Sequence, residues 1–227
     1  MSDLIVIVPS RGRPAAARAL VETFRNTCSA NVFLAFAVDQ DDPERVEYET
    51  VGDGKTSGVL FTPSQNMGEA LNAVALLFLS QEPFAIAFMG DDHCPRTYGW
   101  DTEYLKALRE LGTGIVYGND LLQGENLPTQ VAMTSDIIRA LGYMAPPALV
   151  HLYLDNFWKV LGNGAECLRY LPDVIVEHRH PLVGKAEWDE GYQRVNAPAV
   201  YEHDKTVFEE WLRTSMVSDV AKVRALR

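Results

Sequence analysis

Three side chains that could bind a metal stand together where an apolar segment ends. Asp91, Asp92 and His93 follow the apolar run FAIAFM (84–89) in the stretch GDDHCP. Carboxylates alone would suit Mg²⁺, whereas a histidine among them favours Mn²⁺. An acidic turn that carries a histidine by chance is the alternative. The stretch therefore predicts a divalent metal site at the end of a strand.

Two further histidines could complete this site. His178 closes the apolar run VIVEH (174–178), and His180 follows it in EHRHP. A histidine at a strand end is also often only a partly exposed side chain without a ligand. Both residues are therefore candidate metal ligands.

Charged groups also follow two earlier apolar runs. Arg11 and Arg13 flank Gly12 in PSRGRP, where guanidinium groups are placed to meet an anion such as a diphosphate. Asp39 and Asp41 in DQDDP either form a turn or accept hydrogen bonds from a ribose or a base. Ligands of open parallel sheets bind outside the carboxyl ends of the strands. One binding site shared by these strand ends is the prediction.

The elements that must position these groups alternate in type. Short apolar runs predict strands at 4–8, 32–38, 58–61, 84–89, 115–118 and 174–178. Periodic segments predict helices at 14–27, 66–81, 101–111, 134–141 and 149–161. Asn66 is the expected N-cap of its helix, with Glu69 in capping-box spacing. The alternation predicts an α/β fold with a mostly parallel central sheet covered by helices on both faces.

The chain is expected to form one domain over residues 1–227. It has 227 residues with 47% hydrophobic content, and no repeat or linker interrupts it before about residue 180. Residues 179–200 mix glycine, proline and charge without a period, which predicts a lid loop. Lys185 in this loop is a candidate diphosphate contact. Residues 204–227 are expected to form a C-terminal helix.

The composition of the chain disfavours some classes of binding partner. The net charge of −11 disfavours nucleic acid and acidic membrane surfaces. No apolar run approaches the roughly 20 residues of a membrane span, and three dispersed cysteines favour a reducing compartment. We therefore expect a soluble cytoplasmic protein. Neither a G-x-G-x-x-G nor a P-loop motif is present, so phosphates must be held in another way.

Several motifs together resemble a known family. VPSRGRP after the first strand, an aspartate after the second, NMGEALN (66–72) and the acidic motif after the fourth look like a glycosyltransferase with the Rossmann-like GT-A fold. The inverting family 2 is the nearest. The resemblance implies a nucleotide-sugar donor, most often a UDP-sugar, and Mn²⁺ or Mg²⁺. The donor-side residues that it implies are Pro9, Arg11, Arg13, Asp39, Asn66, Gly68, Asn72 and Asp91.

The resemblance allows two registers for the metal ligands. The D-x-H spacing of Asp91 and His93 is similar to that of polypeptide N-acetylgalactosaminyltransferases. In that register Asp91, His93 and either His178 or His180 would be ligands. A plain D-D alignment would instead make Asp92 the ligand and Asp91 a ribose contact.

The catalytic base of inverting members lies at a helix start on the acceptor side. VHLYLDNFWKVLG (150–162) occupies that place here, so the resemblance implies Asp155 as the base. By residue type alone, Asp155 could equally be an exposed helix residue or a cap. Trp100 and Trp158 could form a sugar platform, although such aromatics are more often core.

Other functions remain open from the sequence. A nucleotidyltransferase acting on sugar phosphates would share the sheet and the metal, but the glycine-rich loop expected after its first strand is missing. A non-catalytic nucleotide-sugar binder would not need Asp155. The acceptor could be a hydroxyl of a glycan or a small molecule. A modified phage DNA base is disfavoured by the acidic charge.

Overall fold

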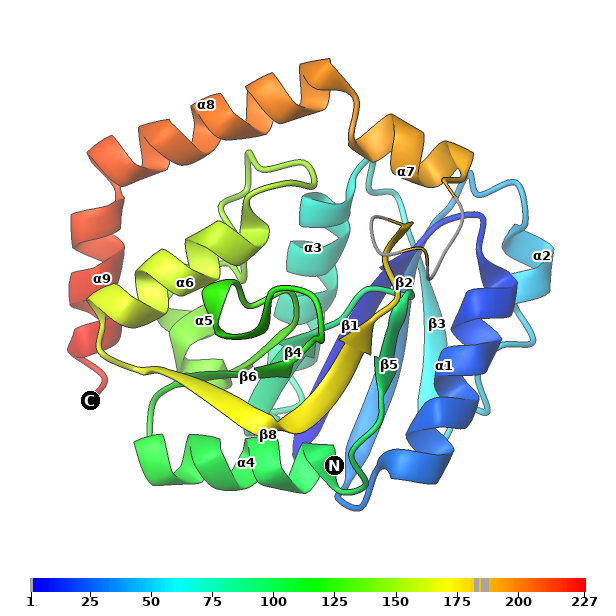
Figure 1. Ribbon diagram of the computed structural model, residues 1–227, viewed down its shortest axis with the longest axis horizontal. Coiled ribbons are helices and arrows are strands. Elements are labelled where there is room, and N and C mark those ends of the chain that lie inside the picture. The colour runs from blue at the N-terminus through cyan, green and yellow to red at the C-terminus, as the bar shows by residue number, and fades with distance from the viewer. Residues whose placement is uncertain (1, 182–183, 185–187) are drawn as a thin grey trace.

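A mixed eight-stranded sheet forms the centre of the protein (Figure 1). The computed structural model describes residues 2–181, 184 and 188–227. The strands follow the order β3-β2-β1-β4-β7-β6-β8-β5 across the sheet. They are β1 Leu4–Ser10, β2 Val32–Asp39, β3 Ser57–Thr62, β4 Ala85–Phe88, β5 His93–Pro95, β6 Ile115–Asn119, β7 Val131–Thr134 and β8 Leu168–His178.

Most neighbouring strands run parallel. β1 pairs in parallel with β2 and β4, β2 with β3, and β6 with β8. β7 runs antiparallel to β4 and β6, and β5 runs antiparallel to β8. The predicted mostly parallel α/β sheet is confirmed. β5 and β7 were not predicted, because HCP and VAMT do not belong to an apolar run long enough to indicate a strand.

Helices cover both faces of the sheet. Strand β1 divides its side chains between two cores: Ile5 and Ile7 join the core under α3, α5, α6 and the C-terminal helices, whereas Leu4, Val6 and Val8 join the core under α1 and α4. No helix among the described residues is long and apolar enough to cross a bilayer. The helices are α1 Pro14–Thr27, α2 Arg45–Tyr48, α3 Met67–Leu79, α4 Trp100–Leu111, α5 Ser135–Leu141, α6 Leu154–Gly164, α7 Glu190–Val195, α8 Pro198–Thr214 and α9 Met216–Arg224, with a short 3-10 helix η1 at Gly124–Asn126.

The C-terminal part differs from the prediction. The segment 179–200 is not one irregular loop, because it contains α7 and the first turn of α8, which opens on Pro198. The expected single helix 204–227 is two helices that meet at Ser215. The helix expected from residue 149 begins only at Leu154. In Figure 1, α8 and α9 run along the outside of the molecule, across the helices of one sheet face.

Candidate functional site

A cavity of about 880 Å³ opens at the carboxyl ends of β1, β2 and β4. This is the edge at which ligands of such sheets bind. Residues from α6, α7 and the end of β8 close its other sides. The residues proposed from the sequence that line it are Pro9, Arg11, Arg13, Asp39, Asp41, Asn66, Asp91, Asp92, His93, Asp155, Trp158, His178 and His180.

Three of these side chains form a cluster that could hold a metal ion. One ligand atom from each of Asp92, His93 and His178 lies within 4.8 Å of the others. The antiparallel pairing of β5 with β8 sets His93 directly opposite His178, and their rings stack with centroids 4.3 Å apart. The short strand β5 therefore joins two histidines that are 85 positions apart in the sequence.

The nitrogen atoms of this cluster fit a cation. The Gly90 N–H donates to His93 Nδ1 over 3.0 Å. Among the described residues, the buried His93 Nε2 and His178 Nδ1 have no hydrogen-bond partner, and a buried polar atom without a partner is costly. Imidazole and carboxylate donors of this kind suit Mn²⁺ or a similar divalent ion. The ring nitrogens nearest the carboxylate are His93 Nδ1 and His178 Nε2, each 3.2 Å from an Asp92 oxygen.

The pKa shifts in the cluster also favour a site that could bind a cation. Burial lowers the pKa of His93, and the neighbouring His178 lowers it further, so the His93 imidazole is neutral. Burial also opposes the charge on Asp92, but contacts with His178 and His93 lower the pKa of this carboxyl well below its usual value. The cluster thus presents a carboxylate beside a neutral imidazole.

Asp91 lies outside this cluster. Its carboxylate accepts hydrogen bonds from Ser10 Oγ over 2.6 Å and from Arg13 Nη1 over 3.2 Å. Burial and the adjacent charge of Asp92 raise the pKa of Asp91. Asp92 therefore lies beside the two histidines, and Asp91 is turned towards β1.

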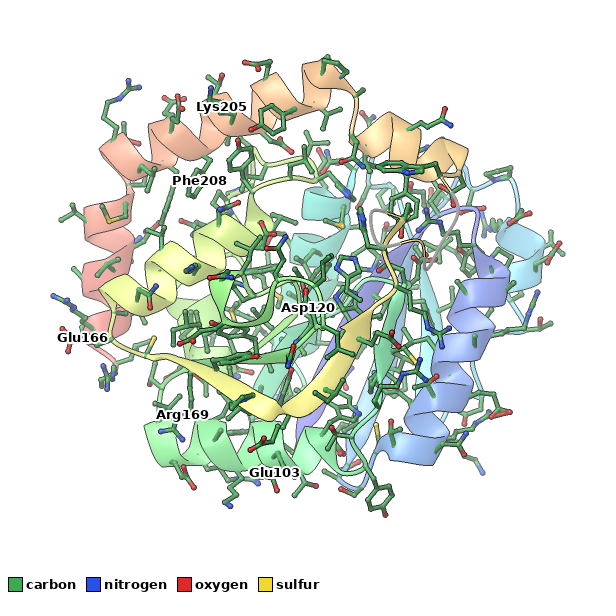
Figure 2. All side chains as sticks on the ribbon, in the orientation of Figure 1. Glu103, Asp120, Glu166, Arg169, Lys205 and Phe208 are labelled. Atoms are coloured by element: carbon green, nitrogen blue, oxygen red, sulfur yellow. The ribbon has the colours of Figure 1, made fainter. Side chains whose placement is uncertain are left out.

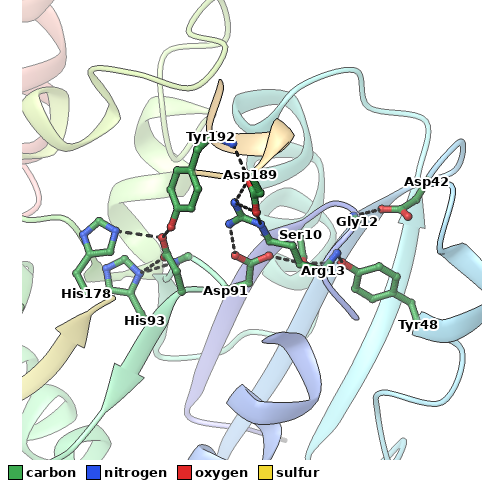
Figure 3. Close-up of polar contacts among 12 residues, drawn as sticks. Ser10, Gly12, Arg13, Asp42, Tyr48, Asp91, His93, His178, Asp189 and Tyr192 are labelled. Atoms are coloured by element: carbon green, nitrogen blue, oxygen red, sulfur yellow. Dashed lines mark hydrogen bonds and ion pairs between the residues drawn. The ribbon is translucent and has the colours of Figure 1, made fainter. Parts of the chain in front are cut away.

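Arg13 connects the site to α7 (Figure 3). Its guanidinium donates to both carboxylate oxygens of Asp189 over 2.9 and 2.8 Å and lies 4.3 Å above the Tyr192 ring. The Tyr192 hydroxyl donates to Asp92 over 2.5 Å. Ser10, Asp189 and Tyr192 were not among the predicted residues. The position of Ser10 at a strand end could have indicated it. Nothing indicated Asp189 and Tyr192, because the sequence 179–200 has no periodic pattern of apolar residues.

Arg11 is held by acidic side chains at the other end of the cavity. Its Nη1 donates to Asp39 over 2.8 Å and to Asp41 over 2.6 Å. Burial raises the pKa of Asp39 in spite of Arg11. The two charged strand ends that were predicted to share a site therefore contact each other.

Asp155 faces the cavity from the first turn of α6. Its Oδ1 accepts the N–H of Asn156 over 2.9 Å. Burial raises the pKa of this carboxyl, and the charge of the nearby His178 opposes that rise. A partly desolvated carboxylate of this kind is suited to accept a proton.

Of the two tryptophans proposed as a sugar platform, only Trp158 lines the cavity. Trp158 lines the cavity, but its ring packs 5.1 Å from Phe88 and its Nε1 donates to the Met144 carbonyl. Trp100 is fully buried beneath the other sheet face, in edge contact with Phe24. The suggestion that Trp100 could stack on a sugar is wrong, because the side chain is core.

The motif NMGEALN divides between the cavity and its support. Asn66 lines the cavity and caps α3 by accepting the Glu69 N–H. Asn72 is buried and binds the backbone of Met144 and Ala145. Gly68 donates its N–H to the Val150 carbonyl. Gly68 and Asn72 do not line the cavity. Their contacts hold the segment before α6, in place of the donor contact expected from the sequence.

Replacing Gly68 by alanine is expected to destabilise the fold by about 1–3 kcal/mol, because the new Cβ would lie 2.0 Å from the Leu149 carbonyl oxygen. The same change at an open helical position normally stabilises by roughly 0.5–1 kcal/mol. Chemical denaturation of Gly68→Ala and the unchanged protein measures the sign. A stabilising effect would contradict the tight contact.

Two further candidates have separate outcomes. His180 lines the cavity, with its ring 5.1 Å from that of His178 and 5.2 Å from that of Tyr192, but it is not in the three-residue cluster. Lys185 lies outside the described residues.

No protein-family model and no curated protein matches the chain. Solved structures do match. TarS 1-349 from S. aureus in complex with UDP has 11% identity and a TM-score of 0.61, with 78% of this chain aligned to 59% of that one. The mannosyltransferase PcManGT from Pyrobaculum calidifontis in complex with GDP-Man and Mn²⁺ has 12% identity and a TM-score of 0.62, with coverage of 99% and 73%.

Glucosyl-3-phosphoglycerate synthase from Mycobacterium tuberculosis, in complex with Mn²⁺, UDP and glucosyl-3-phosphoglycerate, has 11% identity and a TM-score of 0.57. That match covers 81% of this chain and 76% of the synthase. The present chain spans little more than half of the TarS chain. At these identities the likeness establishes the fold, which is the predicted GT-A fold.

Proposed function

From the GT-A fold and its cavity, we propose that this protein transfers a sugar from a nucleotide-sugar donor to an acceptor hydroxyl. The observation that carries the proposal is the cluster of Asp92, His93 and His178 in the cavity lining, in which one carboxylate and two imidazole rings each offer a ligand atom within 4.8 Å of the others. The similar structures of TarS and PcManGT contain UDP and GDP-Man, and that of PcManGT also contains Mn²⁺. A UDP-sugar and Mn²⁺, or Mg²⁺ in its place, are the proposed donor and cofactor.

The donor would lie along the strand ends. Asp39 and Asp91, which line the cavity, would accept hydrogen bonds from the base and ribose, and Arg13 would contact the diphosphate. Asp92, His93 and His178 would hold the metal ion, which stabilises the negative charge of the leaving diphosphate. Tyr192 and Asp189, at the start of α7, cover this part of the cavity and would exclude water from the donor.

Asp155 is the proposed general base. The acceptor oxygen forms a bond to the anomeric carbon while the bond from that carbon to the diphosphate oxygen breaks, and Asp155 takes the proton of the hydroxyl. This displacement inverts the configuration at the anomeric carbon. A hydroxyl of a glycan or small molecule is the proposed acceptor. The three cysteines are free thiols, and a cytoplasmic location is part of the proposal.

Calorimetric titration of UDP and GDP, with Mn²⁺ and with a chelator, tests the donor site. We expect one of the two nucleotides to bind in the presence of Mn²⁺ and to lose most of its affinity when EDTA removes the metal. Radiolabelled donor sugars carrying the nucleotide that binds would then be tested for transfer. If neither nucleotide binds with Mn²⁺, the proposed donor site is wrong.

A further inference from the structure

The segment that leads into Asp155 is held by a carboxylate from a distant helix. Asp204 on α8 accepts the backbone N–H groups of three consecutive residues: Val150 and His151 over 2.9 Å each, and Leu152 over 2.7 Å. Successive N–H groups that converge in this way form an anion-binding nest. Asp204 fills this nest and fixes the direction of the chain just before α6.

Asp204 is fully buried, with 0% of its surface exposed. Burial opposes its charge, but the hydrogen bonds from Val150, His203 and the following N–H groups lower the pKa of this carboxyl. A buried ionised carboxylate is costly unless its partners compensate. Here those partners are mostly the backbone of the segment that carries Asp155, so the charge and the segment depend on each other.

The same segment has a strained backbone. Tyr153, two residues before Asp155, has a φ of 63°, in the left-handed region, which costs a non-glycine residue about 1–2 kcal/mol. Its ring stacks on Phe208, one turn after Asp204 on α8, with centroids 5.3 Å apart. Figure 2 labels Phe208 on the side of α8 that faces the body of the molecule. Helix α8 thus holds both the backbone and the side chain that surround this turn.

The opposite side of the segment contacts α3. The Gly68 N–H donates to the Val150 carbonyl over 3.1 Å. Val150 is therefore bound through its N–H by α8 and through its carbonyl by α3. The segment that leads into α6 is therefore tied by hydrogen bonds to α8 on one side and to α3 on the other.

We infer that Asp204 is a positioning residue for Asp155: by filling the nest at residues 150–152, it sets the start of α6 so that the Asp155 carboxylate faces the acceptor side of the cavity. The inference rests on the proposed transferase function, in which Asp155 is the base. It gives α8 a part in the reaction although none of its charged groups touches the donor site. Displacements of about 1 Å in a catalytic group can lower rates by roughly 100-fold.

A second buried carboxylate makes it possible to separate positioning by Asp204 from a purely stabilising role. Asp219 on α9 is also a buried carboxylate, 3% exposed. It accepts hydrogen bonds from Tyr143, Trp211 and Lys222. It does not line the cavity, and its hydrogen bonds go to Tyr143, Trp211 and Lys222 and not to the N–H groups of residues 150–152. Asp219→Asn is therefore the matched control for the loss of a buried charge on the C-terminal helices.

The experiment uses the wild-type protein, the three single variants Asp204→Asn, Asp219→Asn and Asp155→Asn, and the double variant that combines Asp155→Asn and Asp204→Asn. Release of nucleoside diphosphate from UDP-N-acetylglucosamine and GDP-mannose, with Mn²⁺ and with water as acceptor, measures turnover. Calorimetry with UDP and GDP measures nucleotide affinity, and chemical denaturation measures stability. If Asp204→Asn does not fold, Asp204→Ser keeps an oxygen acceptor in the nest and replaces it in every comparison.

We expect Asp204→Asn to lower turnover by about 10- to 100-fold with nucleotide affinity unchanged, and Asp219→Asn to leave turnover within about twofold at a similar loss of stability. In the double variant, Asp204→Asn should lower turnover no further, because residues that act through one group are non-additive. Equal turnover in Asp204→Asn and Asp219→Asn, or a full additional loss in the double variant, would overturn the inference alone. A wild-type protein without turnover would refute the transferase proposal and the inference with it.

Discussion

Asp155→Asn is expected to lower sugar transfer by about 10²- to 10⁴-fold, the usual contribution of a general base, while UDP or GDP binds as tightly as before. Asparagine keeps the shape of the side chain and its contact with the Asn156 N–H, but it cannot take a proton. The metal cluster and the arginines remain in place. Steady-state transfer rates and calorimetric affinities, measured on the same preparation, separate the two effects.

Asp136→Asn is the control for this substitution. Asp136 also lies in the first turn of a helix, α5, and its Oδ1 accepts the N–H of the next residue, Ile137, over 2.9 Å. It lies outside the cavity, so its replacement should leave transfer unchanged. If Asp155→Asn transfers sugar as fast as Asp136→Asn, Asp155 is not the base. Unchanged nucleotide binding together with no transfer in the wild-type protein would instead favour a non-catalytic binder.

Local patterns predicted the elements that contact their own sequence neighbours. Helix α1 has the predicted limits, residues 14–27, because Pro14 opens it and its apolar face is regular. Helix α3 has Asn66 as its N-cap, as the capping-box spacing indicated. The strands β1, β2 and β4 were predicted because continuous apolar runs are typical of buried parallel strands. At these positions the local preference and the tertiary structure agree.

The differences arise where distant residues decide the structure. Helix α6 begins at Leu154 and not at residue 149, since the N–H groups of Val150 to Leu152 bind Asp204. No local pattern indicates a partner that lies 52 to 54 residues further along the chain. The brief strand β5 exists because β8 pairs with it. The same pairing brings His178, and not His180, next to Asp92 and His93. The sequence alone could not distinguish these two histidines.

The candidate site shows the same division. Residue type and position at strand ends predicted that Arg11, Arg13, Asp39 and the residues 91–93 share one site, and all of them line the same cavity. The sequence did not decide between Asp91 and Asp92, because adjacent residues differ only in the direction of their side chains. That direction depends on Ser10 and Arg13, which draw Asp91 towards β1.

His178→Ala is expected to reduce Mn²⁺ affinity by at least about 100-fold, since even the loss of an outer partner of a metal ligand costs roughly 10- to 100-fold. His178 is one of the three residues of the cluster, and its Nε2 lies 3.2 Å from Asp92 Oδ2. Nucleotide binding that requires Mn²⁺ should fall with it. Paramagnetic resonance of free Mn²⁺ measures the metal directly, without any need for an acceptor.

His203→Ala is the control, because His203 is half exposed on α8 and lies outside the cavity lining. Its replacement should leave Mn²⁺ affinity unchanged, and Asp155→Asn should do the same, because Asp155 is outside the cluster. Metal binding and proton transfer would then be separable functions of one cavity. If His178→Ala binds Mn²⁺ as tightly as His203→Ala, the ion is held elsewhere, and the donor diphosphate must be stabilised without this cluster.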